Sequence, residues 1–153
     1  MKENTERGLE SLKLWQRSIV FAKGICSEIL PLLPPDEKFS VTSQLRRSCQ
    51  SVPANIAEGY GRYYYQDNIR FCYIARGSLE ETFSHLTLAR ELDYLELDVY
   101  NSVCDDIQEM RRMLSGYISF LKTSKRGSAE PGADLQIREA PPIYIADNEN
   151  SQP

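Results

Sequence analysis

The 153-residue sequence is poor in the side chains that most often carry catalysis, because it contains a single histidine, His85. A dinuclear carboxylate site in a helical bundle needs Glu-x-x-His pairs on two helices. Glu81 and His85 are four residues apart, and this pattern occurs once. No Gly-rich phosphate loop is present, and no cysteine has a histidine near it in sequence. We therefore expect a non-enzymatic protein without a catalytic residue, a metal or a cofactor.

Long apolar runs are absent as well. No stretch approaches the roughly 20 apolar residues that a membrane span needs, and residues 1–13 are too polar and charged for a signal peptide. The cysteines are far apart in sequence and form no C-x-x-C pair, which indicates small buried thiols; they are Cys26, Cys49, Cys72 and Cys104. These absences predict a cytoplasmic chain with reduced thiols and no membrane partner.

Charge is distributed unevenly along the chain. Residues 1–126 hold 17 Lys/Arg and 17 Asp/Glu, whereas residues 127–153 hold one arginine and five acidic residues, so the net charge of −4 belongs to the tail. Residues 38–78 hold six basic and two acidic residues. An acidic protein of this kind can still present a locally basic surface.

Apolar residues recur at helical spacing over residues 11–33, 36–58, 66–94 and 98–123. Pro34 and Pro35 separate the first two segments, and Gly59 and Gly61 are a stop signal after the second, where glycine accepts a left-handed cap. Long helices with short connections predict an all-α, antiparallel up-down-up-down four-helix bundle over residues 11–123. We expect a flexible N-terminus (1–10) and a disordered acidic C-terminal tail (124–153), in which only Ile143-Tyr144-Ile145 is apolar.

The same spacing predicts which face of each helix is buried. The stripe expected for the first helix is Leu12, Trp15, Ile19, Ala22, Cys26, Ile29 and Leu33. The stripe expected for the second is Val41, Leu45, Cys49 or Ser48, Val52 and Ile56. The third segment has two adjacent rows, of which one runs through Cys72, Ala75, Leu79, Thr82, Leu86 and Ala89.

Polar residues lie on faces of the second and third segments that should be apolar; they are Gln44, Asn55, Glu58, Ser78, Glu81 and His85. A buried polar group left without a partner costs about 1–3 kcal/mol. Two interpretations stay open: a satisfied network that fixes helix register, or contacts with a neighbouring subunit or a ligand. The first needs only a monomer and is favoured for Asn55 and Ser78. Gly77 is expected to let another helix approach closely.

Arginines and tyrosines accompany this polar set. Arginine binds phosphate in bidentate fashion, and tyrosine rings stack on unpaired bases. The sequence therefore predicts a nucleic-acid-binding set of Arg46, Arg47, Arg62, Arg70, Tyr63 and Tyr64. The competing interpretation is a solvated helix face beside a tyrosine-rich interface.

Three segments, LKLWQRSIVFA, SQLRRSCQSVPANIAEGYGR and RFCYIARGSLEE, resemble the bacterial four-helix-bundle family of 23S rRNA intervening-sequence proteins. The resemblance covers residues 12–94 by motif and the fourth helix by pattern. The matching motif positions are Trp15, Gln44, Arg46, Arg47, Ser51, Asn55, Glu58, Gly59, Arg62, Arg76, Gly77, Ser78 and Glu81. Through this match Ser51 joins Gln44, Asn55, Glu58, Ser78 and Glu81 as a residue expected to set register and assembly.

The resemblance implies a bundle that assembles into a barrel-shaped homopentamer and binds nucleic acid. The family is similar to the accessory variability proteins of diversity-generating retroelements, which bind nucleic acid and a reverse transcriptase through a basic surface. Two functions follow as expectations: a self-assembling protein that binds structured RNA or DNA, or an oligomeric scaffold or adaptor that docks a partner such as a reverse transcriptase. The chain departs from the family at Tyr63, Tyr64 and Tyr65, where small polar or basic residues are usual, and in its acidic tail.

Overall fold

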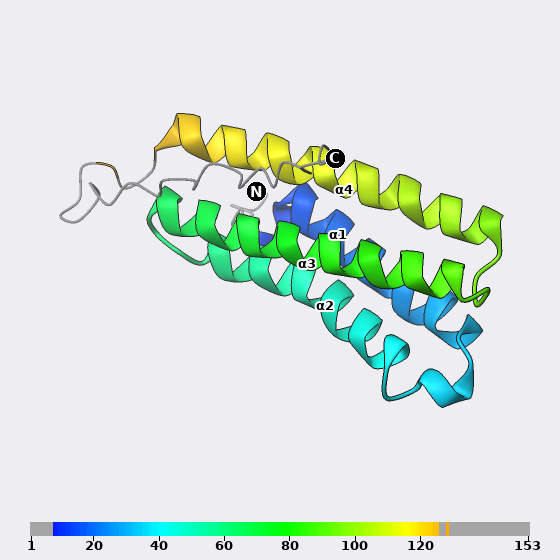
Figure 1. Cartoon of the computed structure of the whole chain (residues 1–153). Coiled ribbons are helices and arrows are strands. Elements are labelled where there is room, and N and C mark those ends of the chain that lie inside the picture. Colours follow the sequence, from blue (N-terminus) through cyan, green and yellow to red (C-terminus); the bar gives the residue numbers. More distant parts are fainter. Residues whose placement is uncertain (1–7, 126–127, 129–153) are drawn as a thin grey trace, which may run out of the picture.

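The computed structural model describes residues 8–125 and 128, and these residues form four long helices and no strand. The helices are α1 (Lys13–Gly24), α2 (Val41–Tyr60), α3 (Tyr65–Glu91) and α4 (Leu97–Ser124). Successive helices run in opposite directions along one bundle (Figure 1). The expected all-α up-down-up-down architecture is confirmed. The predicted tail lies outside the described residues except at 124, 125 and 128, as does the predicted flexible N-terminus except at 8–10.

The first predicted helix differs most from the expectation, because residues 11–33 do not form one α-helix. A 3-10 turn (Leu9–Ser11) precedes α1, and a π turn (Ile25–Ile29) and a 3-10 turn (Leu30–Leu32) follow it. Pro31 explains the change, since it has no N–H to donate to the carbonyl one α-helical turn earlier. The chain therefore leaves α-helical hydrogen bonding before it reaches the proline.

The second helix begins later than expected. A separate 3-10 turn (Pro35–Glu37) precedes it, and α2 starts at Val41. It ends at Tyr60 with Gly61 as its C-cap, so the predicted stop is at the right place. Gly61 has a φ of −71°, however, and the left-handed cap expected there is absent.

The core is built from the predicted faces of α2 and α3. Leu45, Cys49, Val52 and Ile56 are fully buried. On α3 the buried row is the predicted one, Cys72, Ala75, Leu79, Thr82, Leu86 and Ala89. α4 contributes Val103, Ile107, Met110, Leu114, Ile118 and Leu121.

The face predicted to be buried in the first segment is confirmed in part: Ala22, Ile29 and Leu33 are buried, and Leu12, Trp15 and Cys26 pack partly buried against the core. The residues that α1 and its π turn bury include Leu14, Phe21 and Ile25, whereas Ile19 is 42% exposed and Trp15 is half-buried. α1 carries a second apolar row beside the first, and this second row faces α2 at the surface. Periodicity alone does not rank two adjacent apolar rows.

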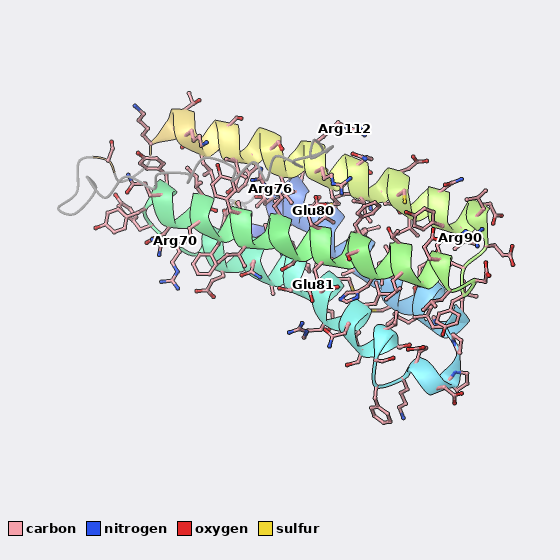
Figure 2. All side chains as sticks on the ribbon, in the orientation of Figure 1. Arg70, Arg76, Glu80, Glu81, Arg90 and Arg112 are labelled. Atoms are coloured by element: carbon pink, nitrogen blue, oxygen red, sulfur yellow. The ribbon has the colours of Figure 1, made fainter. Side chains whose placement is uncertain are left out.

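Ion pairs tie α4 to its two neighbours. Arg17 on α1 donates to Glu109 on α4 at 2.9 Å and also pairs with Asp106. Arg111 on α4 pairs with Glu80 on α3, which lies on the α4 side of that helix in Figure 2. α4 is thus anchored by charge on both flanks, whereas α2 and α3 are joined by one exposed ion pair, between Arg47 and Glu81, and otherwise by neutral hydrogen bonds.

Candidate nucleic-acid interface

Hydroxyl and amide groups join α2 to α3 along a line that we call the α2–α3 seam, made of Ser48, Ser51, Asn55, Ser78 and Thr82. The Oγ atoms of Ser51 and Ser78 are 2.9 Å apart, and Asn55 Nδ2 donates to Ser51 Oγ at 2.9 Å. One turn away, Thr82 Oγ1 donates to Ser48 Oγ at 2.9 Å. The structure therefore brings the predicted Ser51, Asn55 and Ser78 together within one chain. Ser48 and Thr82, which the sequence reasoning did not assign to this set, complete the line.

The charged members of the predicted polar set lie at the surface of the seam. Arg47 donates to Gln44 Oε1 at 2.9 Å and to Glu81 Oε1 at 3.0 Å. His85 Nε2 lies 3.6 Å from the same Glu81 oxygen. Figure 2 shows Glu81 on the side of α3 that faces α2. Gln44 and Glu58 are exposed, so they are surface groups and not buried ones.

Glycine allows the closest approach at one end of the seam. A Cβ on Gly59 would lie 2.8 Å from Asn68 Oδ1 and 2.9 Å from Phe71 Cβ on α3. Gly77 was expected to have this role, but nothing lies within 4 Å of a Cβ built there. That expectation is wrong, because Gly77 is exposed on α3.

Three of the four predicted arginines lie along the outer side of the seam. Arg62 pairs with Glu58 at 2.6 Å, and its guanidinium lies 5.2 Å from the centre of the Phe71 ring. Arg70 is exposed, and Figure 2 shows it on the α2 side of α3, as it does Glu81. Among the described residues no ion pair of Arg70 is recorded. Arg70 therefore has an uncompensated charge available to a ligand.

Arg46 is separated from the other three. Successive residues of an α-helix are about 100° apart around the axis, so Arg46 belongs to the row of Gln50, Pro53 and Ala57. Those residues line a groove against α1. The charge of Arg46 acts on Cys49, whose pKa it lowers against a larger effect of burial. The structure thus places Arg46 toward α1 and Arg47 toward α3.

The predicted tyrosines lie at the turn between α2 and α3. The rings of Tyr63 and Tyr64 pack edge to face with centres 5.4 Å apart. Tyr63 is 52% exposed, and Tyr64 is half-buried at the N-cap of α3. Tyr63 is therefore about half exposed to solvent within the same turn as Arg62.

Two further cations join this end of the bundle from outside the predicted set. Arg76 and Lys122 lie over the ring of Tyr73, at 4.8 Å and 5.8 Å from its centre. Lys122 comes from the end of α4, which the antiparallel topology places beside the start of α3. The hydrogen bond from Asn68 Nδ2 to Tyr117 Oη, at 3.2 Å, holds these two helix ends together. Arg76 could have been chosen from the sequence because it is one of the positions that match the family motif. Lys122 could have been chosen only from the antiparallel topology, which brings the end of α4 beside the start of α3.

We call this region the basic end and define it as Arg62, Arg70, Arg76 and Lys122 with the rings of Tyr63 and Tyr73. Exposed ion pairs contribute only about 0–1 kcal/mol. Arg62 and Arg47 can therefore exchange a carboxylate for a phosphate at little cost. Cations beside aromatic residues, of which Tyr63 is exposed and Tyr73 is half-buried, suit a ligand that has both phosphates and planar bases.

Other chemistries find little support in the described part of the chain. No group of three or more His, Cys, Asp or Glu side chains is arranged to hold a metal within residues 8–125 and 128. Over the same residues, no helix combines the length and apolarity that a bilayer crossing requires. Burial raises the pKa of Cys72 to about 12, so this thiol is protonated at neutral pH and is a poor nucleophile.

Comparison with known proteins agrees with the fold and with the family resemblance. A family model described as "23S rRNA-intervening sequence protein" matches residues 10–116. A solved structure from Bacteroides thetaiotaomicron VPI-5482, described as a protein of unknown function from the S23 ribosomal protein family, is similar with a TM-score of 0.63 and 28% identity. The alignment covers 69% of this chain and 97% of that chain. No curated protein matches. The matched range includes the seam and every residue of the basic end except Lys122.

Proposed function

The chain belongs to the 23S rRNA-intervening sequence protein family, and from that premise we propose that it is a non-enzymatic helical-bundle protein that binds structured RNA or DNA. The basic end, together with Arg47 farther along the seam, supplies the contact. The observation that carries the proposal is the meeting of cations from the α2–α3 turn, α3 and α4 over the rings of Phe71 and Tyr73 at one end of the bundle.

We expect contacts between cations and phosphates to contribute most of the binding free energy, and stacking of bases on aromatic rings to contribute the rest. Each phosphate neutralised by a cation changes log K by about −0.9 per unit of log salt for duplex DNA, so affinity falls steeply as salt rises. A base stacked on an aromatic ring adds about 1–3 kcal/mol. An RNA hairpin that offers a duplex stem and unpaired loop bases therefore fits the basic end better than a plain duplex.

We propose that the protein acts as a homo-oligomer in the cytoplasm, with the pentamer as the form implied by family resemblance. Large apolar side chains stay exposed on the single chain and support this proposal; they include Ile19, Ile74, Leu88, Leu92 and Phe120. An oligomer would repeat the basic end in every copy and raise avidity for a long nucleic acid. Native mass spectrometry measures the oligomeric state directly.

Replacing one exposed arginine at a time tests the nucleic-acid proposal. Arg70→Ala removes a charge from the basic end without leaving an ion-pair partner behind. We expect about tenfold weaker binding to a hairpin RNA and a loss of about one unit in the salt slope. The measurement is fluorescence anisotropy with the labelled hairpin over a series of salt concentrations.

Arg112→Ala is the matched control for that experiment. Arg112 is also an exposed arginine, but it lies on α4, away from the α2–α3 seam (Figure 2). We expect its variant to bind the hairpin as the unaltered chain does. Equal losses in both variants, or binding that does not depend on salt, would contradict the proposal.

A second candidate function is that of an oligomeric scaffold or adaptor which docks a partner protein, such as a retroelement reverse transcriptase. The observation that favours it is an apolar groove of about 540 Å³ between α1 and α2, which we call the α1–α2 groove. Its lining residues include Trp15, Ile19, Ala22, Cys26, Pro53, Ala54 and Ala57. This function predicts that Ile19→Glu abolishes a complex with the partner protein and leaves hairpin binding unchanged.

A further inference from the structure

Two cysteines from different helical segments lie side by side at the α1–α2 groove. The Sγ atoms of Cys26 and Cys49 are 3.9 Å apart, although 23 residues separate them in sequence. A disulfide needs about 2.05 Å between its sulfur atoms. The two sulfurs must therefore approach by roughly 2 Å to bond. The structure records no such sulfur neighbour for Cys72 or Cys104 among the described residues.

The backbone that carries Cys26 is the irregular part of the first helical segment. Cys26 lies in the π turn Ile25–Ile29, between α1 and the 3-10 turn that contains Pro31. π turns inside helices occur often at functional sites. A shift of Cys26 toward α2 therefore falls on a turn that has already left α-helical hydrogen bonding, and it does not have to break a regular helix.

The two thiols differ in how well solvent reaches them. Cys26 is half-buried and lines the α1–α2 groove, so a small oxidant has a route to its sulfur. Cys49 is fully buried. Burial first, and then the neighbouring Cys26, raise the pKa of Cys49 to about 12. Cys26 is therefore the thiol that reacts first with an oxidant. Cys49 is the resolving thiol because its sulfur lies 3.9 Å from that of Cys26, and its raised pKa makes the second step slow.

We propose that Cys26 and Cys49 form a redox-sensitive pair, which hydrogen peroxide converts into a disulfide between the π turn and α2. The Cys26 thiolate attacks one peroxide oxygen; the S–O bond forms, the O–O bond breaks, and hydroxide leaves and takes up a proton as water. Cys49 then gives up its proton and attacks the Cys26 sulfur; the S–S bond forms, and the S–O bond breaks with release of a second water. The two thiols lose two electrons, and peroxide gains them.

The disulfide would change the groove and not the basic end. It draws the π turn onto α2 and removes the Cys26 thiol from the lining of the α1–α2 groove. It also closes a loop between residues 26 and 49, which restricts the unfolded chain and raises the thermal midpoint. This inference does not depend on nucleic-acid binding, because both sulfurs lie on the α1 side of α2.

Peptide mapping of the full chain after peroxide treatment tests the proposal. Trypsin cleavage under non-reducing conditions separates residues 24–38, with Cys26, from residues 48–62, with Cys49. We expect these two peptides to appear as one linked species that separates on reduction. The variants Cys72→Ser and Cys104→Ser should form the same link. Links to Cys104, links between copies of the chain, or stable sulfenic acid on Cys26 in the unaltered chain would overturn the proposal.

Arg46 and Arg47 offer a matched pair of variants that tests the second chemical step, the attack of Cys49 on the Cys26 sulfur. Arg46 lowers the pKa of Cys49 by its charge, whereas Arg47 points to Glu81 across the α2–α3 seam. Arg46→Ala should therefore slow disulfide closure several-fold, and Arg47→Ala should leave the rate unchanged. Equal rates in both variants would refute the assistance of Arg46 in the second step, and a peptide map without the link to Cys49 would refute Cys49 as the resolving thiol.

Discussion

The two flanks of α2 face different neighbours and use different chemistry. Toward α3, the seam is closed by hydroxyl and amide hydrogen bonds of about 2.9 Å, such as those of Ser51 with Ser78 and of Thr82 with Ser48. Toward α1, the flank is an open apolar groove that Cys26 lines, with the buried thiol of Cys49 3.9 Å from the Cys26 sulfur. Arg46 and Arg47 are consecutive in sequence, yet Arg46 lies on the flank toward α1 and Arg47 on the flank toward α3.

The difference in contact chemistry decides how tightly each neighbouring helix is held against α2. Hydrogen bonds depend on distance and angle, so the seam accepts one register of α3 against α2. Apolar contact has no preferred direction, so the groove constrains α1 less closely. The seam therefore provides a fixed platform for the arginines, whereas the groove can change shape or accept another chain.

The largest predicted effect is at the glycine where α2 approaches α3. Gly59→Ala places a Cβ within 3 Å of Asn68 and Phe71 and should destabilise the fold by about 1–3 kcal/mol. Gly77→Ala meets nothing within 4 Å and should stabilise α3 by about 0.5–1 kcal/mol. Urea unfolding followed by circular dichroism gives both values. Equal effects would mean that the seam is not tightly packed at Gly59.

The next effect compares one substitution on each flank. Thr82→Val removes the buried hydroxyl that donates to Ser48 and should cost about 1 kcal/mol, although valine is the more apolar residue. Ile19→Gln makes the groove more polar and should stay within about 0.5 kcal/mol of the unaltered chain, because Ile19 is 42% exposed. Denaturant midpoints of the two variants, compared where their unfolding transitions have the same m-value, show which substitution destabilises the protein more. A larger loss from Ile19→Gln would show that the groove is closed by another part of the protein.

The smallest effect concerns the ion pair between α3 and α4. The hydrogen bond from Arg111 lowers the pKa of Glu80 below its ordinary value of 4.5. The pair therefore contributes fully above about pH 4.5 and loses its contribution as pH falls through the lowered value. Glu80 is half exposed, so the gain is under about 1 kcal/mol. Arg111→Leu should make the free energy of unfolding fall less steeply as pH is lowered below about 4.5. An unchanged pH dependence would mean that other carboxylates cause the loss of stability in acid.

Much of the fold was predictable from sequence because long amphipathic helices repeat one pattern many times. The α3 row from Cys72 to Ala89 was predicted residue by residue, and α4 was predicted to within one residue at each end. α1 was predicted less well, because Trp15 and Ile19 form an apolar row as regular as that of Leu14 and Phe21. Local spacing shows that a face is apolar but not which neighbour covers it.

Residues of the candidate site were predictable from the sequence only where their chemical type alone suggested a role at an interface. Arg62, Arg70 and Tyr63 were expected at an interface, and the structure places them near one another at one end of the bundle. Arg46 was grouped with Arg47 because they are adjacent in sequence, yet the helix turns them toward different neighbours. Ser48 and Thr82 looked like ordinary small residues until packing placed their hydroxyl groups 2.9 Å apart.

The sequence by itself determined the helical class, the approximate extent of α2, α3 and α4, and the family, because these depend on local spacing and on motifs that stay close in the chain. Only the tertiary structure decided which row of α1 is buried, that Cys26 meets Cys49, and that Lys122 meets Tyr73. Each of these depends on contacts between segments far apart in sequence. Such contacts depend on how whole helices pack, and no local pattern encodes them.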